Sequence, residues 1–281
     1  MSILRGKKKD MAIKYRAFIE DNFSISDKAG KIVPFKFNPI QTKFFENDYA
    51  DESIVLKARQ QGFSSLITAI FATDFILRAN SYSAVVADVE ENATGLLDKI
   101  KFYLDSYAAK TGVKVPLKYD SRFELYNPLK KSRIIIGTAR STEFGRSRTI
   151  TNLLLSEIAF YPNIEKILAG AGQAVVEGGR KILETTANGF NDFKKIWEAA
   201  VLGESIYKPL FYNAEDFYPA EFLSKKKKEL GDRFMQEYPS NPVEAFISSG
   251  QLYFNREALK TILTFANNFK QRGINVIPAI S

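Results

Sequence analysis

Two residue types are absent from the 281-residue chain, cysteine and histidine. The lack of cysteine fits a reducing cytosol, where disulfides are rare. Without histidine, Ser-His and Cys-His catalysis are excluded, and so is every zinc site built from cysteine and histidine. Any chemistry in this chain therefore depends on carboxylates, hydroxyls, lysine, arginine, tyrosine and a hard cation such as Mg²⁺.

Long apolar runs are missing as well. No stretch of eighteen apolar residues occurs, so we expect no membrane span. The segment 1–9 lacks the apolar region of a secretory signal. Lysine and arginine number 40 against 32 acids, which gives a formal charge of +8. This balance favours a polyanionic partner such as nucleic acid, although a merely soluble basic protein has the same composition. The lysine run 225–228 predicts a solvated helical face.

Short apolar segments alternate with helical ones along most of the chain. We expect strands at 54–56, 84–87, 133–137, 152–155 and 181–186, and helices at 64–78 and about 90–109. This pattern predicts an α/β fold with a mainly parallel sheet covered by helices on both faces. Ligands of such sheets lie beyond the carboxyl ends of the strands, so the loop after 54–56 and the ends of 152–155 and 181–186 should converge. From about residue 216 onward, turn-rich segments predict a smaller lid or linker subdomain.

The stretch 53–65 has the order of a phosphate-binding loop, with an apolar strand, a short polar loop and a helix start. Backbone N–H groups and the positive dipole end of such a helix suit an anion. Against the pattern G-x-x-x-x-G-K-[ST], Gly62 and Ser64 match the second glycine and the magnesium-binding hydroxyl. Phe63 stands where the lysine is expected, and Lys57 replaces the first glycine. The cation thus enters from the front of the loop. A bare structural turn is the alternative interpretation of this segment alone.

The strand 152–155 is followed by Ser156 and Glu157. For nucleotide hydrolysis, this strand end must supply a contact to the magnesium shell and a base that orients water. Glu157 suits the second role, whereas Ser156 occupies the place of a common aspartate without bringing negative charge. An ordinary capping Ser-Glu pair is the alternative.

Polar residues also mark two other places. The strand 181–186 ends in Thr185 and Thr186 and is followed by Asn188, and these polar side chains would face the γ-phosphate. The alternative is an ordinary Thr/Asn/Gly turn, which is common. Upstream, Gln41 follows an aromatic segment at 35–40. A glutamine amide can pair with both the donor and the acceptor of an adenine edge, whereas aromatic residues before a helix more often belong to the core.

These segments occur in a characteristic order: 35–41, 57–64, Phe-Gly-Arg-Ser-Arg at 144–148, Leu-Leu-Leu-Ser-Glu-Ile-Ala-Phe at 153–160 and Thr-Thr-Ala-Asn-Gly at 185–189. Together with the stretch 234–250, the combination closely resembles the ATPase domain of the large terminase subunit of tailed bacteriophages. Many of those proteins carry the loop lysine at the front, as Lys57 is here. Their second motif often places Ser-Glu in an apolar strand before Ala-Phe. The resemblance spans roughly residues 35–254.

The resemblance implies a P-loop NTPase fold of the ASCE/RecA-like type and a Mg²⁺-dependent ATPase that drives double-stranded DNA into a viral procapsid. Glu157 would act on water, Arg59 would hold phosphate, and Arg146 would reach across subunits as an arginine finger. Ser64 and Glu157 would serve the metal. The implied nucleotide-binding residues are Gln41, Lys57, Arg59, Gln60, Gln61, Gly62, Phe63, Ser64, Ser65, Thr186 and Asn188.

The implied organisation is an N-terminal segment with the adenine-binding region (1–50), an ATPase core (51–215) and a lid or linker subdomain (216–281). A complete large terminase continues into a nuclease with clustered acids. We expect no nuclease here, because Glu257 is the one acid after Phe254.

The implied partners are double-stranded DNA, the portal or procapsid and the small terminase subunit, with no membrane. We expect a homo-oligomeric ring in the assembled motor, a monomer in isolation, and a location in the host cytoplasm, docked on the procapsid. Two other functions stay open: a RecA-like helicase or translocase, and a non-catalytic basic DNA-binding module. A helicase would normally carry a second RecA-like domain, for which 281 residues leave no room.

Overall fold

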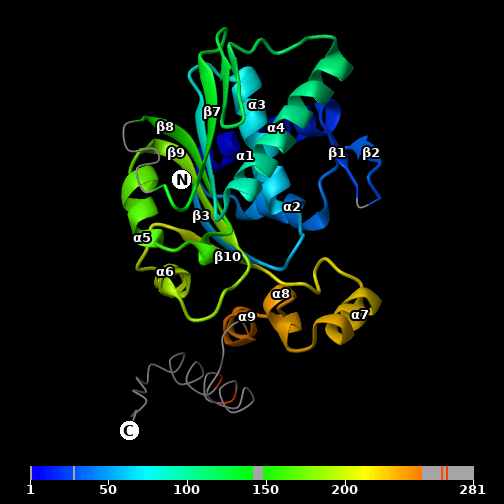
Figure 1. The fold of residues 1–281 in the computed structure, drawn as a ribbon, viewed down its shortest axis with the longest axis vertical. Coiled ribbons are helices and arrows are strands. Elements are labelled where there is room, and N and C mark those ends of the chain that lie inside the picture. Colours follow the sequence, from blue (N-terminus) through cyan, green and yellow to red (C-terminus); the bar gives the residue numbers. More distant parts are fainter. Residues whose placement is uncertain (1, 28, 142–147, 249–260, 262–263, 265–281) are drawn as a thin grey trace.

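A computed structural model describes residues 2–27, 29–141, 148–248, 261 and 264. Its centre is an eight-stranded sheet with the strand order β10-β3-β9-β8-β4-β7-β6-β5 (Figure 1). The six strands from β10 to β7 run parallel, and β6 and β5 add to one edge in antiparallel fashion. The strands of this sheet are β3 (Glu52–Lys57), β4 (Tyr82–Ala87), β5 (Tyr119–Asp120), β6 (Glu124–Asn127), β7 (Ser132–Thr138), β8 (Ile150–Ser156), β9 (Val175–Thr185) and β10 (Lys208–Tyr212).

Helices cover both faces of the sheet, which confirms the predicted α/β class (Figure 1). A separate two-stranded ribbon, β1 (Ser24–Ser26) with β2 (Ile32–Pro34), lies beside α4. The helices are α1 (Ser2–Asn22), α2 (Pro39–Lys43), α3 (Phe63–Leu77), α4 (Glu90–Thr111), α5 (Ile164–Ile167), α6 (Asp192–Val201), α7 (Ala220–Leu230), α8 (Phe234–Glu237) and α9 (Pro242–Ser248). In the described part of the chain, no helix has the length and apolar character needed to cross a bilayer.

Alternating side chains of the strands build two separate apolar cores. Val55, Val85 and Leu154 face one side, where they join residues of α1, α2, α3 and α4. Their neighbours Leu56 and Leu155 face the other side, where they pack with residues of α5 and α6. Because both faces are covered, the central strands are apolar almost throughout, as the sequence predicted.

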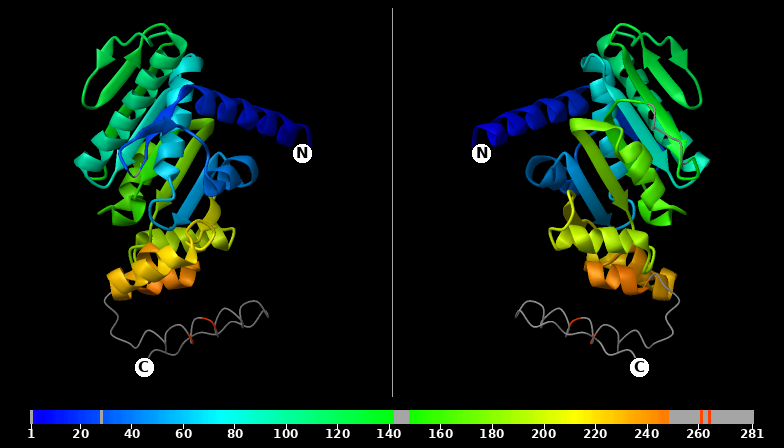
Figure 2. Two further views of the ribbon diagram at one scale, coloured as in Figure 1. Left: turned by 90° about the vertical axis from the view of Figure 1, so that its right-hand side faces the viewer. Right: turned by 90° about the vertical axis from the view of Figure 1, so that its left-hand side faces the viewer.

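Helices α7 to α9 form a layer beyond the carboxyl ends of the central strands (Figure 2). This layer has its own small apolar cluster, in which Tyr218 and Tyr238 pack against Ala58 of the loop after β3. The lysine run 225–228 lies on α7, a helix without buried residues, as expected for a solvated face. The proposed boundary near residue 216 falls in the turn region between β10 and α7.

Candidate nucleotide-binding site

Three neighbouring strands of the sheet end at one place. Lys57 is the last residue of β3, Ser156 the last of β8 and Thr185 the last of β9. Strand β9 lies between the other two and pairs with both in parallel. The predicted convergence of the loop after β3 with the ends of the other two strands is therefore confirmed.

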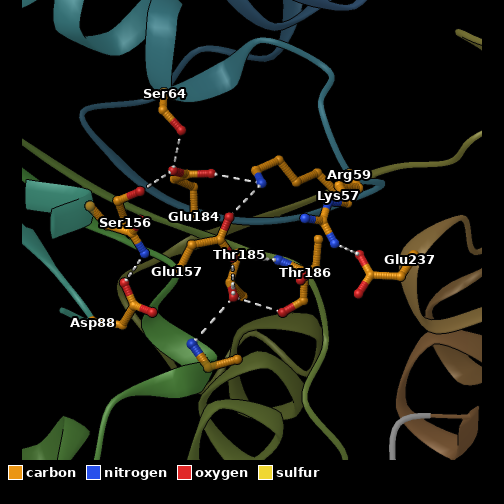
Figure 3. A network of polar contacts seen from close by, with 12 residues as sticks. Lys57, Arg59, Ser64, Asp88, Ser156, Glu157, Glu184, Thr185, Thr186 and Glu237 are labelled. Atoms are coloured by element: carbon orange, nitrogen blue, oxygen red, sulfur yellow. Dashed lines mark hydrogen bonds and ion pairs between the residues drawn. The ribbon is translucent and has the colours of Figure 1, made fainter. Parts of the chain in front are cut away.

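The Lys57 ammonium group lies between two carboxylates (Figure 3). Its Nζ is 3.3 Å from Glu157 Oε1 and 3.1 Å from Glu184 Oε2, and the lysine side chain is 5% exposed. Burial by itself would lower the pKa of Lys57, but the two carboxylates outweigh it and raise that pKa. A permanently charged cation thus stands at the front of the loop.

Glu184, on β9, is a residue to which the sequence analysis assigned no role. Its side chain is fully buried, and Oε1 accepts hydrogen bonds from Ser64 Oγ at 2.8 Å and Ser156 Oγ at 2.6 Å (Figure 3). Burial would raise its pKa, but Lys57 and the two hydroxyl donors outweigh burial and lower it. The group is therefore an anion inside the protein, held by one cation and two hydroxyls.

Glu157 has a left-handed backbone, with φ 58° and ψ 42°, which is uncommon for a residue other than glycine. Its Oε2 lies 3.3 Å from both Thr185 Oγ1 and the Thr186 amide nitrogen. Burial is the main cause that raises the pKa of Glu157, Glu184 adds to it, and Lys57 offsets part of the rise. A carboxylate of raised pKa is a suitable proton acceptor.

Gln41 closes the loop from the side. Its Nε2 donates to the Gly62 carbonyl at 2.8 Å, and its Oε1 accepts from the Asn38 amide at 3.0 Å. Gly62 has φ 80°, and a Cβ there would lie 2.7 Å from Gln41 Nε2, so any other residue would be strained and would displace the Gln41 amide. Asn38 Nδ2 donates to the Gln61 carbonyl at 3.0 Å. Gln41 is 4% exposed and acts here as a clamp on the loop; its reading of adenine stays a prediction.

The remaining loop residues divide between core and surface. Phe63 is buried and packs on Tyr212, with ring centroids 4.9 Å apart, so its side chain belongs to the core. Gln61 is buried and donates to the Asn213 carbonyl at 2.6 Å, whereas Gln60 is exposed with φ 57°. Ser65 Oγ lies 3.5 Å from Lys99 Nζ, which brings a second lysine to the loop from α4.

Comparison with known structures identifies the fold. Over 73% of this chain and 93% of the other, it superposes on the large terminase ATPase domain of Thermus phage P74-26 with a TM-score of 0.55 and 17% identity. The large terminase of bacteriophage HK97 matches with a TM-score of 0.60 and 17% identity over 92% of this chain and 53% of that one. The fold is that of a large-terminase ATPase domain. No family model matches the sequence.

A third similar structure carries a nucleotide analogue. The large terminase of a thermophilic bacteriophage, in complex with ATP-γ-S, has a TM-score of 0.55 at 12% identity, over 72% of this chain and 52% of that one. This chain spans about half the length of that terminase and of the HK97 terminase. The resemblance to a terminase ATPase domain, expected from the motifs, is confirmed at the level of the fold.

In this terminase fold, Arg59 joins the loop to the α7–α9 layer. The Arg59 amide donates to the Glu237 carbonyl at 2.8 Å, and its guanidinium lies 3.3 Å from Glu237 Oε2. Tyr218 donates to the Arg59 carbonyl at 2.7 Å. The Arg59 side chain is 58% exposed, so the guanidinium has room to turn from Glu237 toward a bound anion.

The segment after β9 contacts the turn that follows Glu157. Asn188 Nδ2 donates to the Ala159 carbonyl at 3.2 Å, and the Thr186 amide reaches Glu157. Thr186 thus contacts the candidate base itself, and Asn188 contacts the turn that follows it. Arg146 lies outside the described residues, and Arg148, at the edge of the described part, contacts the Tyr82 hydroxyl.

The oxygen atoms at the site suit a hard cation. Ser64 offers a hydroxyl, and Glu157 and Glu184 offer carboxylates, all of which are ligand types that Mg²⁺ accepts. Among the described residues, no group of three or more acids, histidines or cysteines gathers as a metal cage.

Proposed function

We propose that this chain is the ATPase part of a large terminase, which hydrolyses ATP with Mg²⁺ to move double-stranded DNA into a procapsid. The observation that carries the proposal is the placement of Lys57 between Glu157 and Glu184 at the carboxyl ends of β3, β8 and β9, within a terminase-type fold. A buried cation, the N–H groups of a helix start and a carboxylate that can act on water are parts that phosphoryl transfer uses.

The binding roles follow from the contacts. Lys57 and Arg59 each lie beside a carboxylate that a phosphate group can replace, and the N–H groups of Gly62 to Ser65 belong to the same loop. Ser64 would hold Mg²⁺, which, when bound, neutralises part of the phosphate charge. Gln41 would contact adenine, and Gln60, Gln61 and Phe63 would shape the loop through backbone groups.

The chemical step belongs to Glu157. Its carboxylate would take a proton from water as the water oxygen attacks the γ-phosphorus, and the bond to the ADP oxygen breaks. Thr185 and Thr186 contact the same carboxylate, and Asn188 contacts the following turn, so loss of phosphate would be transmitted to this segment. The Arg59–Glu237 pair would transmit it to α7–α9.

Assembly completes the proposal. Arg146 would enter the site of a neighbouring subunit, where an arginine supplied in trans contributes about 10³–10⁵-fold to phosphoryl transfer. The net charge of +8 suits double-stranded DNA. The portal, the procapsid and the small terminase subunit would be the protein partners in the host cytoplasm.

A phosphate-release assay with double-stranded DNA and Mg²⁺ tests the proposal. The purified protein should release phosphate from ATP, and Glu157→Gln should reduce turnover by about 10²–10⁴-fold while ATP still binds, because the amide cannot accept a proton. The control is Glu177→Gln, an exposed acid at the other end of β9, which should keep full activity. Absence of phosphate release from the unmutated protein in the presence of DNA would favour the non-catalytic DNA-binding alternative.

A further inference from the structure

The end of β8 carries a serine beside the candidate base. Ser156 stands directly before Glu157, where an acid would commonly support the magnesium ion. Its hydroxyl can donate a hydrogen bond but brings no negative charge. If Glu157 is the base that acts on water, a second carboxylate near the metal would come from another element.

The neighbouring strand supplies it. Ser156 and Glu184 are direct partners in the parallel register of β8 and β9, so their side chains leave the sheet on the same face. The Ser156 hydroxyl donates to Glu184 Oε1 at 2.6 Å. The carboxylate of Glu184 is thus located one strand away from the expected position, and directly beside it.

The same oxygen reaches the phosphate loop. Glu184 Oε1 accepts from Ser64 Oγ at 2.8 Å, and Ser64 is the hydroxyl that we assign to Mg²⁺. Its other oxygen, Oε2, is 3.1 Å from Lys57 Nζ. Burying a carboxylate costs free energy unless cations or hydrogen-bond donors contact it. The buried Glu184 carboxylate contacts Lys57, Ser64 and Ser156, and so connects β3, the start of α3 and β8.

We propose that Glu184 is a positioning residue that replaces the missing acid of β8: it orients Ser64 and places a negative charge beside the Mg²⁺ that Ser64 holds. This inference rests on the proposed function and adds to it a specific source of metal affinity. A simpler role, in which Glu184 only anchors Lys57, predicts a different dependence on Mg²⁺, and that difference can be measured.

The experiment returns the carboxylate to β8. The double variant Ser156→Asp/Glu184→Thr keeps the number of side-chain heavy atoms and moves the charge by one strand. Its matched control, Ser156→Asn/Glu184→Thr, has the same shape without the charge. Glu184→Gln removes the charge in place. For each protein, the affinity for a fluorescent ATP analogue is measured with Mg²⁺ and with EDTA, and thermal melting reports folding.

Mg²⁺ should strengthen analogue binding by the unmutated protein and by the Asp/Thr variant. Glu184→Gln and the Asn/Thr control should lose about 10–100-fold of that gain, as is typical when a group behind a metal ligand is removed. An equal loss of affinity with and without Mg²⁺ in Glu184→Gln would show that Glu184 only anchors Lys57, and would overturn the inference. If Glu184→Gln does not fold, the Asp/Thr and Asn/Thr pair decides, and an equal Mg²⁺ gain in the two would overturn it as well. If the unmutated protein binds and hydrolyses ATP but the variants give either of these two results, this inference fails and the proposed function stands. If the unmutated protein does not bind the analogue, both the inference and the proposed function are contradicted.

Discussion

Lys57 and Glu184 lie on adjacent parallel strands, and Nζ of the first is 3.1 Å from Oε2 of the second, with both side chains buried. Glu157 and Glu184 thus pair with the Lys57 ammonium group, which is the cation that ATP phosphates would need. If ATP binds as proposed, a phosphate would replace one of these carboxylates beside Lys57, and the lysine would not have to move into water. Because Lys57 stands at the front of the loop, as the last residue of β3, its side chain reaches Glu157 after β8 and Glu184 on β9.

Lys57→Ala should abolish measurable ATP binding or weaken it by at least about tenfold, because it removes the buried cation and leaves two carboxylates facing the phosphates. The matched control is Lys181→Ala. Lys181, on β9, is also buried and ion-paired, with Nζ 3.1 Å from Glu52 Oε1. It lies beside the first residue of β3, at the opposite end of that strand from Lys57. Titration with a fluorescent ATP analogue compares the two. Equal affinities of Lys57→Ala and Lys181→Ala would contradict the assignment of Lys57.

Gln41→Ala should narrow the preference for ATP over GTP, since a bidentate amide contact with a base edge is worth about 1–3 kcal/mol. The control is Asn38→Ala, which also loosens the loop by removing the bond to the Gln61 carbonyl but has no predicted contact with the base. Competition binding with both nucleotides measures the ratio. If Gln41 is only a clamp, both variants will weaken ATP and GTP in equal proportion.

The acid limb of the pH profile should reflect Glu157. Burial and the charge of Glu184 raise its pKa, so the carboxylate takes up a proton at a higher pH than an ordinary glutamate, whose pKa is about 4.3. A base must be ionised to act, so kcat/KM for ATP should fall as pH drops while still above that ordinary range. Steady-state assays across pH at constant ionic strength measure the limb. Activity that persists down to about pH 4 would assign the base elsewhere.

A buried ionic network near α1 should control stability without touching the site. Arg180 of β9 contacts Asp74, donates to Asn152 Oδ1 at 2.8 Å and to the Tyr49 hydroxyl at 2.6 Å. Arg180→Ala removes the buried cation of Asp74 and leaves it paired with the more exposed Arg78 at 3.5 Å; loss of one partner of a buried pair costs about 3–5 kcal/mol. Arg133→Ala, which breaks a more exposed pair with Glu124, should cost about 1 kcal/mol or less. Urea unfolding compares them; similar losses would mean that the network contributes little.

Much of the sheet was predictable from the sequence because its strands are short, apolar and separated by helical periodicity. The strand expected at 181–186 is present but begins earlier, at Val175. Its first half was not predicted because it is more polar and exposed. Strand β10 was not predicted. It contains Pro209 and lies at the edge of the sheet, where a proline is tolerated and the apolar pattern is short.

The site residues that belong to a sequence motif were predictable, whereas the one that is placed by the pairing of β8 with β9 was not. Lys57, Ser64 and Glu157 stand at recognisable positions in the chain, and the structure brings them together. Glu184 was missed because an acid at the end of a strand reads as a solvated residue, and its partner Ser156 is 28 positions away in the sequence. The uncharged Ser156 beside Glu157 was the one signal in the sequence that could have directed attention to an acid on a neighbouring strand.

The central claim is that the shared carboxyl edge of β3, β8 and β9 binds the phosphates of ATP. A crystal structure of the protein with Mg²⁺ and a non-hydrolysable ATP analogue tests it most directly. We predict that Lys57 Nζ contacts the β- or γ-phosphate, that Ser64 Oγ binds the metal, and that Glu157 faces the γ-phosphate. An analogue bound at any other surface, with Lys57 still between Glu157 and Glu184, would contradict the account.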